Sequence, residues 1–352
     1  MLKVQFGGRE AFVDTDIIII GAGITGLTCA RRLRQAGITA LVLEKARGVG
    51  GRCATRRVEG QPVDHGVIFL HGSDPDFLAA LDAVENASPL PGWPDRLSGS
   101  GTPCQPEAFH KYERRLAFAE GVSAFPKQLA VGLTIQLNTR VTSLVSGAST
   151  FELQTEDGTT FEARTVVVTA PIEQTREFVK ALPNISTELQ SVRLLLDMIS
   201  TEPCLTLLAG YPLDVPEPTW DVCYPEDSTA FLLMSHDSNK RAQKQFHTLV
   251  YQCRPLWSRE RLEQDPDTWS RDILDEAGRL LGTWATEPLW TQAHRWRFGR
   301  VESASALTSP VLLVFGQNQR LGLAGEAFTP NGGVEAAWLS GRRIAERILG
   351  ER

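Results

Sequence analysis

The sequence predicts an α/β fold in which a domain of parallel strands and helices is interrupted by a second, α+β domain. Its 352 residues fit two domains at the usual length of about 100 to 200 residues each. A buried strand at Asp16–Ile20, a glycine turn, a helix over Ile24–Ala36 and a strand at Ala40–Leu43 form a βαβ unit. The last fifty residues return to this pattern, with strands at Val311–Phe315 and Leu321–Ala324 and a helix over Val334–Leu349.

Between these ends the pattern changes several times. We expect a loop over residues 88–106, a helix near Ser123–Val131, and two helices near Asn239–Gln252 and Thr268–Leu281. Short strands are expected at Thr134–Leu137, Val141–Ser146, Phe151–Thr155, Thr160–Ala163 and Thr165–Thr169. The sequence therefore predicts a discontinuous first domain of residues 1–80, 120–172 and 300–352. Residues 81–119 and 173–299 are expected to form the second domain, which faces the substrate.

Composition excludes several classes of protein. The 36 basic and 42 acidic residues give a net charge of −6, which argues against a nucleic-acid-binding protein. Six scattered cysteines form no C-x-x-C pair, so reduced thiols are expected rather than a zinc site or a disulfide framework. The sequence shows no signal-peptide pattern and no apolar run of the roughly 20 residues that span a bilayer. We therefore expect a cytoplasmic protein without a membrane span.

The glycine turn of the βαβ unit matches G-x-G-x-x-G in Gly21-Ala22-Gly23-Ile24-Thr25-Gly26. Gly21 permits a tight turn, Gly23 allows a pyrophosphate to approach the backbone, and Gly26 lets the helix pack closely on the strand. Ile24 and Thr25 open the helix, whose free N–H groups and positive dipole end attract phosphate. The motif predicts a dinucleotide site.

Two features after this turn specify the dinucleotide. Glu44 ends the second strand, where a carboxylate accepts hydrogen bonds from an adenosine ribose and repels a 2′-phosphate. A second glycine-rich segment, Gly48-Val49-Gly50-Gly51-Arg52, follows directly. Its backbone and guanidinium are suited to a further part of a pyrophosphate, which favours FAD over NAD.

At this point the chain resembles FAD-dependent oxidoreductases of the flavin amine oxidase superfamily, and within them the short renalase-like proteins. The segments that carry the resemblance are Glu44–Arg52, Asp64-His65-Gly66, Val141 with Thr169-Ala170-Pro171, His294–Phe298, Gly325-Glu326 and Gly332–Gly341. The resemblance implies a Rossmann-type FAD-binding domain of the glutathione-reductase and amine-oxidase type, with an inserted substrate domain.

The same resemblance implies a role for each matched position. Asp64-His65-Gly66 is similar to a turn that faces the flavin ring, and Val141 to a residue that holds the adenine through its backbone. Glu326 replaces an aspartate that binds a ribityl hydroxyl, and the N–H groups of Gly333 and Val334 are expected to be free to face the flavin. The implied FAD-binding residues are Gly21, Gly23, Ile24, Thr25, Gly26, Glu44, Lys45, Gly51, Arg52, His65, Gly66, Val141, Gly325, Glu326, Gly333 and Val334.

Few residues suggest acid–base chemistry, because the chain has no nucleophile elbow, no H-E-x-x-H motif and no His/Cys cluster at ligand spacing. The residues that we expect near the substrate are His71, His236, Trp296 and Phe328. The four tyrosines all precede residue 252, which departs from the tyrosine pair of monoamine oxidases. No cysteine follows Cys253, so the flavin is expected to be non-covalent.

The leading hypothesis is therefore a renalase-like oxidase that accepts hydride from isomers of NAD(P)H and passes electrons to molecular oxygen, giving hydrogen peroxide. An amine oxidase or a desaturase acting on another metabolite is the alternative within the same class. A flavin-binding protein without turnover and a nicotinamide-only dehydrogenase are the alternatives from other classes. The sequence leaves the true substrate and the oligomeric state open.

Overall fold

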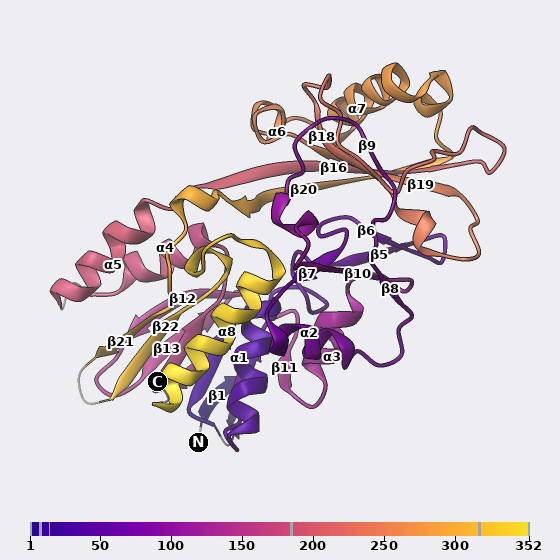
Figure 1. Ribbon diagram of the computed structural model, residues 1–352. Coiled ribbons are helices and arrows are strands. Elements are labelled where there is room, and N and C mark those ends of the chain that lie inside the picture. The colour runs from indigo at the N-terminus through magenta and orange to yellow at the C-terminus, as the bar shows by residue number, and fades with distance from the viewer. Residues whose placement is uncertain (1, 7–8, 14, 184–185, 316–317, 351–352) are drawn as a thin grey trace. The chain divides into compact units, whose positions relative to one another are not determined.

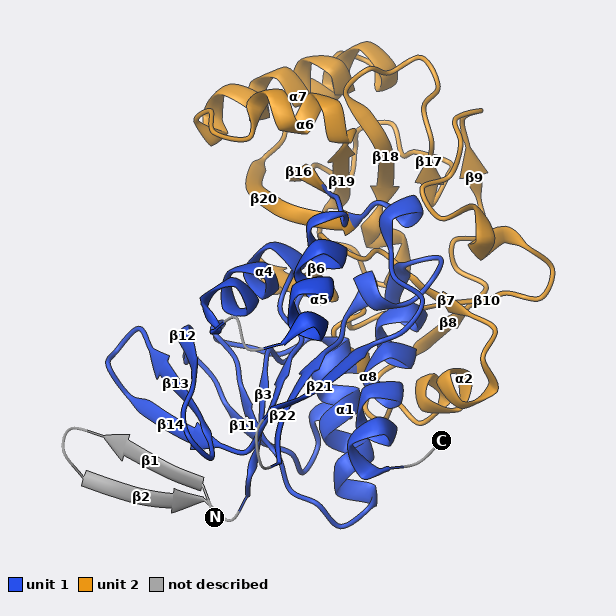
Figure 2. Ribbon diagram, turned by 90° about the vertical axis from the view of Figure 1, so that its left-hand side faces the viewer, with its two compact units in different colours: residues 1–51, 126–201, 301–352 blue, residues 52–125, 202–300 orange. Residues whose placement is uncertain are grey.

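The computed structural model describes residues 2–6, 9–13, 15–183, 186–315 and 318–350 (Figure 1). Contacts divide the chain into two compact units (Figure 2). Unit 1 consists of residues 1–51, 126–201 and 301–352, and unit 2 of residues 52–125 and 202–300. Both units combine helices with sheets, so the predicted α/β class is confirmed.

A six-stranded sheet forms the centre of unit 1, in the order β11-β4-β3-β15-β22-β21. Its strands are β3 (Ile17–Ile20), β4 (Leu41–Leu43), β11 (Thr134–Gln136), β15 (Thr165–Val168), β21 (Val311–Phe315) and β22 (Gln319–Leu323). Every neighbouring pair is parallel except β21 and β22, and β3, β4 and β15 are buried along their whole length. These continuous apolar runs are typical of strands covered on both faces.

Helices α1 (Ile24–Gln35) and α8 (Gly333–Leu349) lie side by side in unit 1 (Figure 1). The hydroxyl of Thr25 donates a hydrogen bond to the carbonyl of Ala337, 2.8 Å away. At Gly341 a Cβ atom would overlap the Thr25 carbonyl, so a larger residue there would push the helices apart. The first and last elements that the sequence predicted are therefore packed together.

A second sheet of unit 1 has the order β12-β13-β14-β1-β2. Its strands are β1 (Leu2–Phe6), β2 (Arg9–Val13), β12 (Val141–Ser146), β13 (Phe151–Thr155) and β14 (Thr160–Ala163). Helices α4 (Ile172–Ala181) and α5 (Thr187–Asp197) follow β15, and α3 (Ala124–Ala130) lies at the unit boundary. The predicted strands β12, β13 and β14 are confirmed at both ends.

Unit 2 is built on a sheet in the order β20-β16-β19-β18-β17-β9. Its strands are β9 (Leu97–Ser98), β16 (Thr201–Tyr211), β17 (Val222–Cys223), β18 (Phe231–His236), β19 (His247–Cys253) and β20 (Trp290–Val301). Helices α6 (Pro255–Arg261) and α7 (Pro266–Leu281) cover one face, where Trp269 and Ile273 of α7 are fully buried (Figure 2). The predicted helix over Thr268–Leu281 is confirmed.

The predicted helix over Asn239–Gln252 is wrong. The structure has a single 3₁₀ turn, η2 (Asp237–Lys240), and then strand β19, which is buried at all seven positions. A central strand covered on both faces has no polar face, so its apolar spacing does not distinguish it from a helix.

The remaining elements of unit 2 are short. Strands β5 (Thr55–Val58) and β6 (Gln61–Asp64) form a hairpin, and β7 (Leu70–Gly72), β8 (Pro89–Pro91) and β10 (Arg114–Phe118) form a three-stranded sheet. Helix α2 (Pro75–Asp82) begins after Asp74, whose carboxylate accepts hydrogen bonds from the N–H groups of Asp76 and Phe77. The 3₁₀ turns outside η2 are η1 (Pro106–Phe109), η3 (Thr283–Thr286), η4 (Ser303–Ser305) and η5 (Glu326–Phe328). The predicted loop over residues 88–106 contains β8 and β9.

The two compact units do not coincide with the predicted domains. Residues 52–80 lie in unit 2 and residues 173–201 in unit 1. The units follow from packing, whereas the predicted domains divide the chain by function, and that division stays a prediction. Across the part of the chain that the structure describes, no helix combines the length and apolar character that crossing a bilayer requires.

Candidate functional site

The G-x-G-x-x-G turn of unit 1 leaves strand β3 and enters helix α1. A Cβ atom on Gly26 would overlap the carbonyl oxygen of Gly21, so only glycine fits at this helix–strand crossing. At Gly23, by contrast, a Cβ atom would meet nothing within 4 Å in the part of the chain that the structure describes. Gly23 has no side chain to cap α1, and the first turn carries no acidic residue. The positive dipole end of the helix therefore has no side-chain cap.

The second glycine-rich segment lies against the first one. The N–H of Gly50 donates to the carbonyl of Ala22 at 2.8 Å, and Gly23 and Gly50 form a parallel bridge. A Cβ atom on Gly51 would lie 3.7 Å from the Cα of Gly23. Two stretches of bare backbone thus border the same space, a cradle that fits the pyrophosphate of a dinucleotide.

Glu44 follows β4 and is held at the edge of this turn. Its two carboxylate oxygens accept hydrogen bonds from the N–H groups of Ala22 and Ala46, each at 2.7 Å, and the residue is 8% exposed. Each oxygen keeps a second lone pair for a ribose hydroxyl. The next residue, Lys45, donates to the side-chain oxygen of Gln174 at 3.3 Å. At Val141 the register between β12 and β13 shifts.

The C-terminal motif corrects one expectation. The N–H of Gly333 was expected to be free, but it donates to Oε1 of Glu326 at 2.9 Å. Glutamate has one more methylene than aspartate, so its carboxylate reaches the N-terminus of α8 and stabilises it. Phe328, in the turn that starts with Glu326, is 1% exposed and packs in the core of unit 1. The cofactor and substrate roles of these residues stay predictions.

In unit 2, Trp296 fixes the Asp64-His65-Gly66 turn. Its indole N–H donates to the carbonyl of His65 at 3.0 Å, and the Gln252 amide donates to the carbonyl of Gly66 at 2.5 Å. A Cβ atom on Gly66 would overlap the carbonyl of Arg52 and press on the Trp296 ring. Two segments that the resemblance selected are thus joined directly, although His65 and Trp296 are 231 residues apart in sequence.

Three rings gather at this turn, and we call His65, His294 and Trp296 the ring cluster. The His65 ring stacks on Trp296 with centroids 5.3 Å apart, and the His294 ring lies 4.8 Å from His65 and 4.1 Å from Trp296. The guanidinium of Arg56 contacts Nδ1 of His294 at 3.1 Å and Gln292 at 3.1 Å. Burial lowers the pKa of His65 to about 3 and that of His294 to about 4, with Arg56 adding to both shifts. Both imidazoles are neutral at pH 7.

The low pKa of His65 makes stability depend on pH. Between pH 3 and 6.5 the unfolded chain binds a proton that the folded state does not, so this contribution is complete above about pH 6.5 and is lost on acidification. The loss amounts to at most about 1.4 kcal/mol per pH unit. We expect His65→Gln to flatten the decline in urea-unfolding free energy between pH 6.5 and 5. Exposed His110→Gln is the control; equal slopes in wild type and His65→Gln would contradict the assignment.

Asp64, the first residue of the turn, belongs to a buried charge cluster that sequence reasoning missed. Its Oδ2 accepts from Nζ of Lys240 at 2.7 Å, and Nζ also donates to Asp237 at 2.8 Å and to the Ile68 carbonyl at 2.6 Å. Arg241 pairs with the other oxygen of Asp237. The side chains of Asp64, Lys240 and Asp237 are fully buried, and that of Arg241 is nearly so. The cluster therefore contains two acidic and two basic side chains.

This charge cluster holds the turn in place. Oδ1 of Asp64 accepts hydrogen bonds from the Thr55 hydroxyl at 2.6 Å and from the N–H of Val122 at 3.0 Å. Burial favours a raised pKa at Asp237, but Arg241 and Lys240 outweigh it and lower that pKa, which keeps the carboxylate ionised. The only sequence signal was the spacing Asp237-x-x-Lys240-Arg241, which is common on solvated surfaces.

The other two catalytic candidates lie in separate groups. His71, on β7, contacts the carboxylate of Glu113 through Nδ1 at 3.0 Å. His236, at the end of β18, is fully buried beside His247, with ring centroids 5.4 Å apart. Burial lowers the pKa of His236 to about 4, with Lys244 and His247 contributing. Of the predicted substrate-side residues, therefore, only Trp296 lies in the ring cluster.

Comparison with known families decides the kind of protein. The model of the family described as flavin containing amine oxidoreductase matches residues 90–349, and that of an NAD(P)-binding Rossmann-like domain matches residues 19–84. The first match covers well over half of the chain. The chain belongs to the flavin-containing amine oxidoreductase family. Members of this family are FAD-dependent oxidoreductases, so the predicted enzyme class and FAD cofactor are confirmed at that level.

Individual curated relatives match a short region. The pseudooxynicotine dehydrogenase of a Pseudomonas species is 36% identical over 74 residues, which are 21% of this chain and 15% of that protein. The putrescine oxidase of Kocuria rosea is 36% identical over 77 residues, 22% of this chain and 16% of that protein. The chain thus aligns with about one sixth of these relatives' length.

Solved structures match the fold over nearly the whole chain. Cyclohexylamine oxidase from Brevibacterium oxydans has a TM-score of 0.71 at 15% identity, covering 96% of this chain and 100% of that one. A putrescine oxidase bound to putrescine has a TM-score of 0.69 at 15% identity, with 96% and 99% covered. At this identity the likeness establishes the fold alone.

Proposed function

We propose that the protein is an FAD-dependent oxidase that takes hydride from a reduced dihydronicotinamide, an isomer of NAD(P)H, and uses molecular oxygen as electron acceptor. The overall reaction, dihydronicotinamide plus O₂ plus a proton giving the nicotinamide and H₂O₂, is balanced in atoms and electrons. The observation that carries the proposal is the ring cluster, in which two neutral imidazoles and an indole lie beside one cation, Arg56.

When bound, FAD supplies the hydride acceptance and the transfer of two electrons to oxygen. The bare backbone of Gly23 and Gly51 would hold its pyrophosphate, and Glu44 would hold its ribose. Trp296 and Gln252 fix the carbonyls of His65 and Gly66, so this turn is set before substrate arrives. A direct hydride donor needs no protein base, in agreement with imidazoles whose lowered pKa makes them weak bases.

Arg56 favours an anionic substrate over a cationic one. Its guanidinium extends from β5 toward Gln292 and His294 on β20. A phosphate or another anionic group would gain charge-assisted hydrogen bonds there. A protonated amine would be repelled by the same charge.

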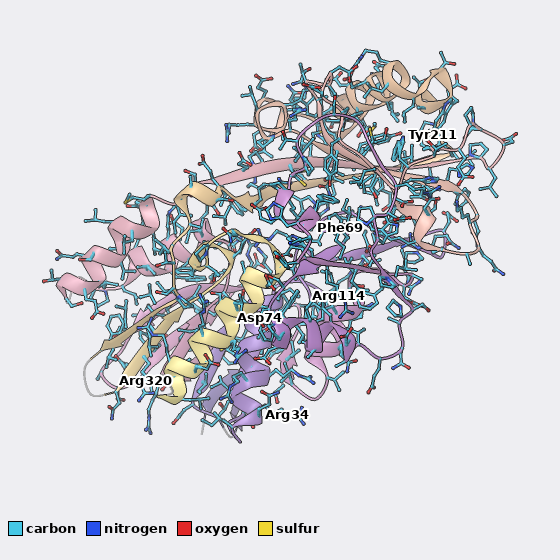
Figure 3. The ribbon with its side chains drawn as sticks, viewed as in Figure 1. Arg34, Phe69, Asp74, Arg114, Tyr211 and Arg320 are labelled. Atoms are coloured by element: carbon cyan, nitrogen blue, oxygen red, sulfur yellow. The ribbon has the colours of Figure 1, made fainter. Side chains whose placement is uncertain are left out.

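The family match favours amine oxidation as the second candidate, since putrescine oxidase and pseudooxynicotine dehydrogenase are among the relatives. The tyrosines of this chain do not support it. Tyr211 and Tyr251 share a hydrogen bond of 2.8 Å in the sheet core of unit 2, and Figure 3 shows Tyr211 among these strands. Tyr224 packs against Phe109, and Tyr112 is 77% exposed. Each tyrosine is therefore placed outside the ring cluster.

The two candidates differ in the effect of removing Arg56. We expect the wild-type protein to form H₂O₂ with NADPH isomers but not with putrescine. In Arg56→Met the KM for these isomers should be at least about tenfold higher, because a charge-assisted hydrogen bond contributes about 1.5 to 3 kcal/mol. Neighbouring Arg57→Met, whose exposed side chain donates to the carbonyl of Gly60, is the matched control. Amine turnover that Arg56→Met leaves intact or improves would favour the second candidate.

A further inference from the structure

A group of three potential metal ligands lies in unit 2, and the proposed function assigns none of them to FAD or substrate. It consists of Glu217, His236 and His247, which we call the histidine–glutamate cluster. One ligand atom from each lies within 4.8 Å of the other two. His236 ends β18 and His247 begins β19, so the two histidines flank one hairpin. Glu217 comes from the segment between β16 and β17.

The two histidines are buried without satisfying their ring nitrogens. His236 is 0% exposed, and among the described residues neither of its nitrogens has a hydrogen-bond partner. The backbone of Pro218 stands near this ring, but outside hydrogen-bond geometry. His247 is 4% exposed, and its Nδ1 also lacks a partner in the described part of the chain. Unsatisfied buried polar atoms are costly and rare, so these nitrogens point to an absent ligand.

The second nitrogen of His247 indicates which atom is available. Nε2 lies 3.3 Å from the carbonyl of Leu213, and only a protonated nitrogen bonds a carbonyl oxygen. In the neutral ring Nδ1 then carries a lone pair, and it lies 4.0 Å from Oε1 of Glu217. A histidine whose far N–H is held by a backbone carbonyl, and whose near lone pair is directed at a carboxylate, has the usual arrangement of a metal ligand.

We propose that Glu217, His236 and His247 bind one Zn²⁺ ion. Two imidazoles and a carboxylate form a recurring zinc ligand set and leave a fourth position for water. Mg²⁺ and Ca²⁺ prefer all-oxygen sites, which this cluster does not provide. When zinc binds, the three ligand atoms would move closer together and form Zn–N and Zn–O bonds of about 2.0 to 2.2 Å. A zinc ion at this site would link the segment around Glu217 to the β18–β19 hairpin.

Lys244 competes with the ion for the glutamate. Its ammonium lies 2.5 Å from Oε1 of Glu217 and 2.6 Å from Oδ1 of Asn239, and its side chain is 23% exposed. Zinc binding therefore requires the ammonium to leave Glu217, while Asn239 and solvent can still receive it. Removing this charge is expected to tighten zinc binding by about two- to fivefold, the amount expected for a partly exposed ion pair.

The test is zinc binding by the purified, FAD-containing protein, measured by equilibrium dialysis and metal analysis. We expect one zinc per chain, affinity at least about tenfold weaker in Glu217→Gln, and tighter binding in Lys244→Met. Exposed Glu217 can be changed without disturbing the core, and Glu260→Gln is the matched control, because Glu260 is an exposed glutamate paired with Arg261. X-ray absorption should show two imidazoles and one carboxylate around the ion.

Equal zinc affinity in wild type and Glu217→Gln would overturn the proposal, as would the absence of stoichiometric zinc. Weaker binding in Lys244→Met would also overturn it, because the ammonium would then support the site rather than compete with the ion. The proposal stands independently of the FAD chemistry, since metal content and X-ray absorption are measured without turnover.

Discussion

Gly23→Ala is expected to lower FAD affinity by at least about 100-fold while leaving the fold of the apoprotein intact. A Cβ atom at Gly23 meets none of the described residues within 4 Å, and the backbone there has φ −73°, which any residue adopts. The added methyl group would instead occupy the space that we assign to the pyrophosphate. Losing two charge-assisted hydrogen bonds, each worth about 1.5 to 3 kcal/mol, accounts for this factor.

The measurement is FAD titration of the apoprotein, followed by quenching of flavin fluorescence. Ala36→Val, at the exposed C-terminal end of the same helix, is the control, because it adds apolar volume away from the cradle. Thermal melting of the two apoproteins separates a lost cofactor site from a lost fold. Wild-type FAD affinity in Gly23→Ala would show that the pyrophosphate lies elsewhere.

Lys240→Met is expected to destabilise the protein by about 3 to 5 kcal/mol, the usual cost of removing one partner from a buried ion pair. The change leaves Asp64 and Asp237 without the ammonium that now lies 2.7 and 2.8 Å from them, although both carboxylates remain buried. It also removes the ammonium that lies 4.4 Å from the centroid of the Trp93 ring. Arg241 alone cannot compensate two buried negative charges.

Urea unfolding of the FAD-saturated protein would measure this loss. Exposed Lys180→Met, which breaks an ion pair with Glu177 on helix α4, should cost less than about 1 kcal/mol. Adding Asp64→Asn to Lys240→Met should recover part of the loss, because one of the two unpaired charges disappears. A loss in Lys240→Met no larger than in Lys180→Met would mean that the cluster does not hold the turn.

Local sequence was sufficient to predict the nucleotide side of the fold. The isoleucine run of β3, the glycines at 21, 23 and 26, and Glu44 each follow from short-range physics, and the structure places β3 and α1 within one or two residues of the prediction. The helix predicted over Asn239–Gln252 failed because β19 is covered on both faces, so its pattern has no polar side.

Long-range pairing explains what the sequence did not predict. Lys240 and Asp237 have no distinctive neighbours in the chain, and their role appears only when Asp64, more than 170 residues earlier, is brought to them. In the ring cluster, Trp296 and His65 were selected separately by resemblance. Their contact with each other was not predicted, because it depends on the position of β20. Likewise the N–H of Gly333 was expected to be free, whereas the extra methylene of Glu326 lets its carboxylate accept a hydrogen bond from it.

The most direct test of the account is an anaerobic titration of the purified protein with NAD(P)H that contains a known fraction of its isomers, followed by the flavin spectrum. The account predicts a yellow protein whose flavin is bleached rapidly, with an amplitude limited by the isomer content, and is not bleached by putrescine. Denaturation should release the flavin as free FAD. A flavin that stays oxidised with the isomers but is bleached by an amine would contradict the proposed substrate, and a colourless protein would contradict the proposed FAD site.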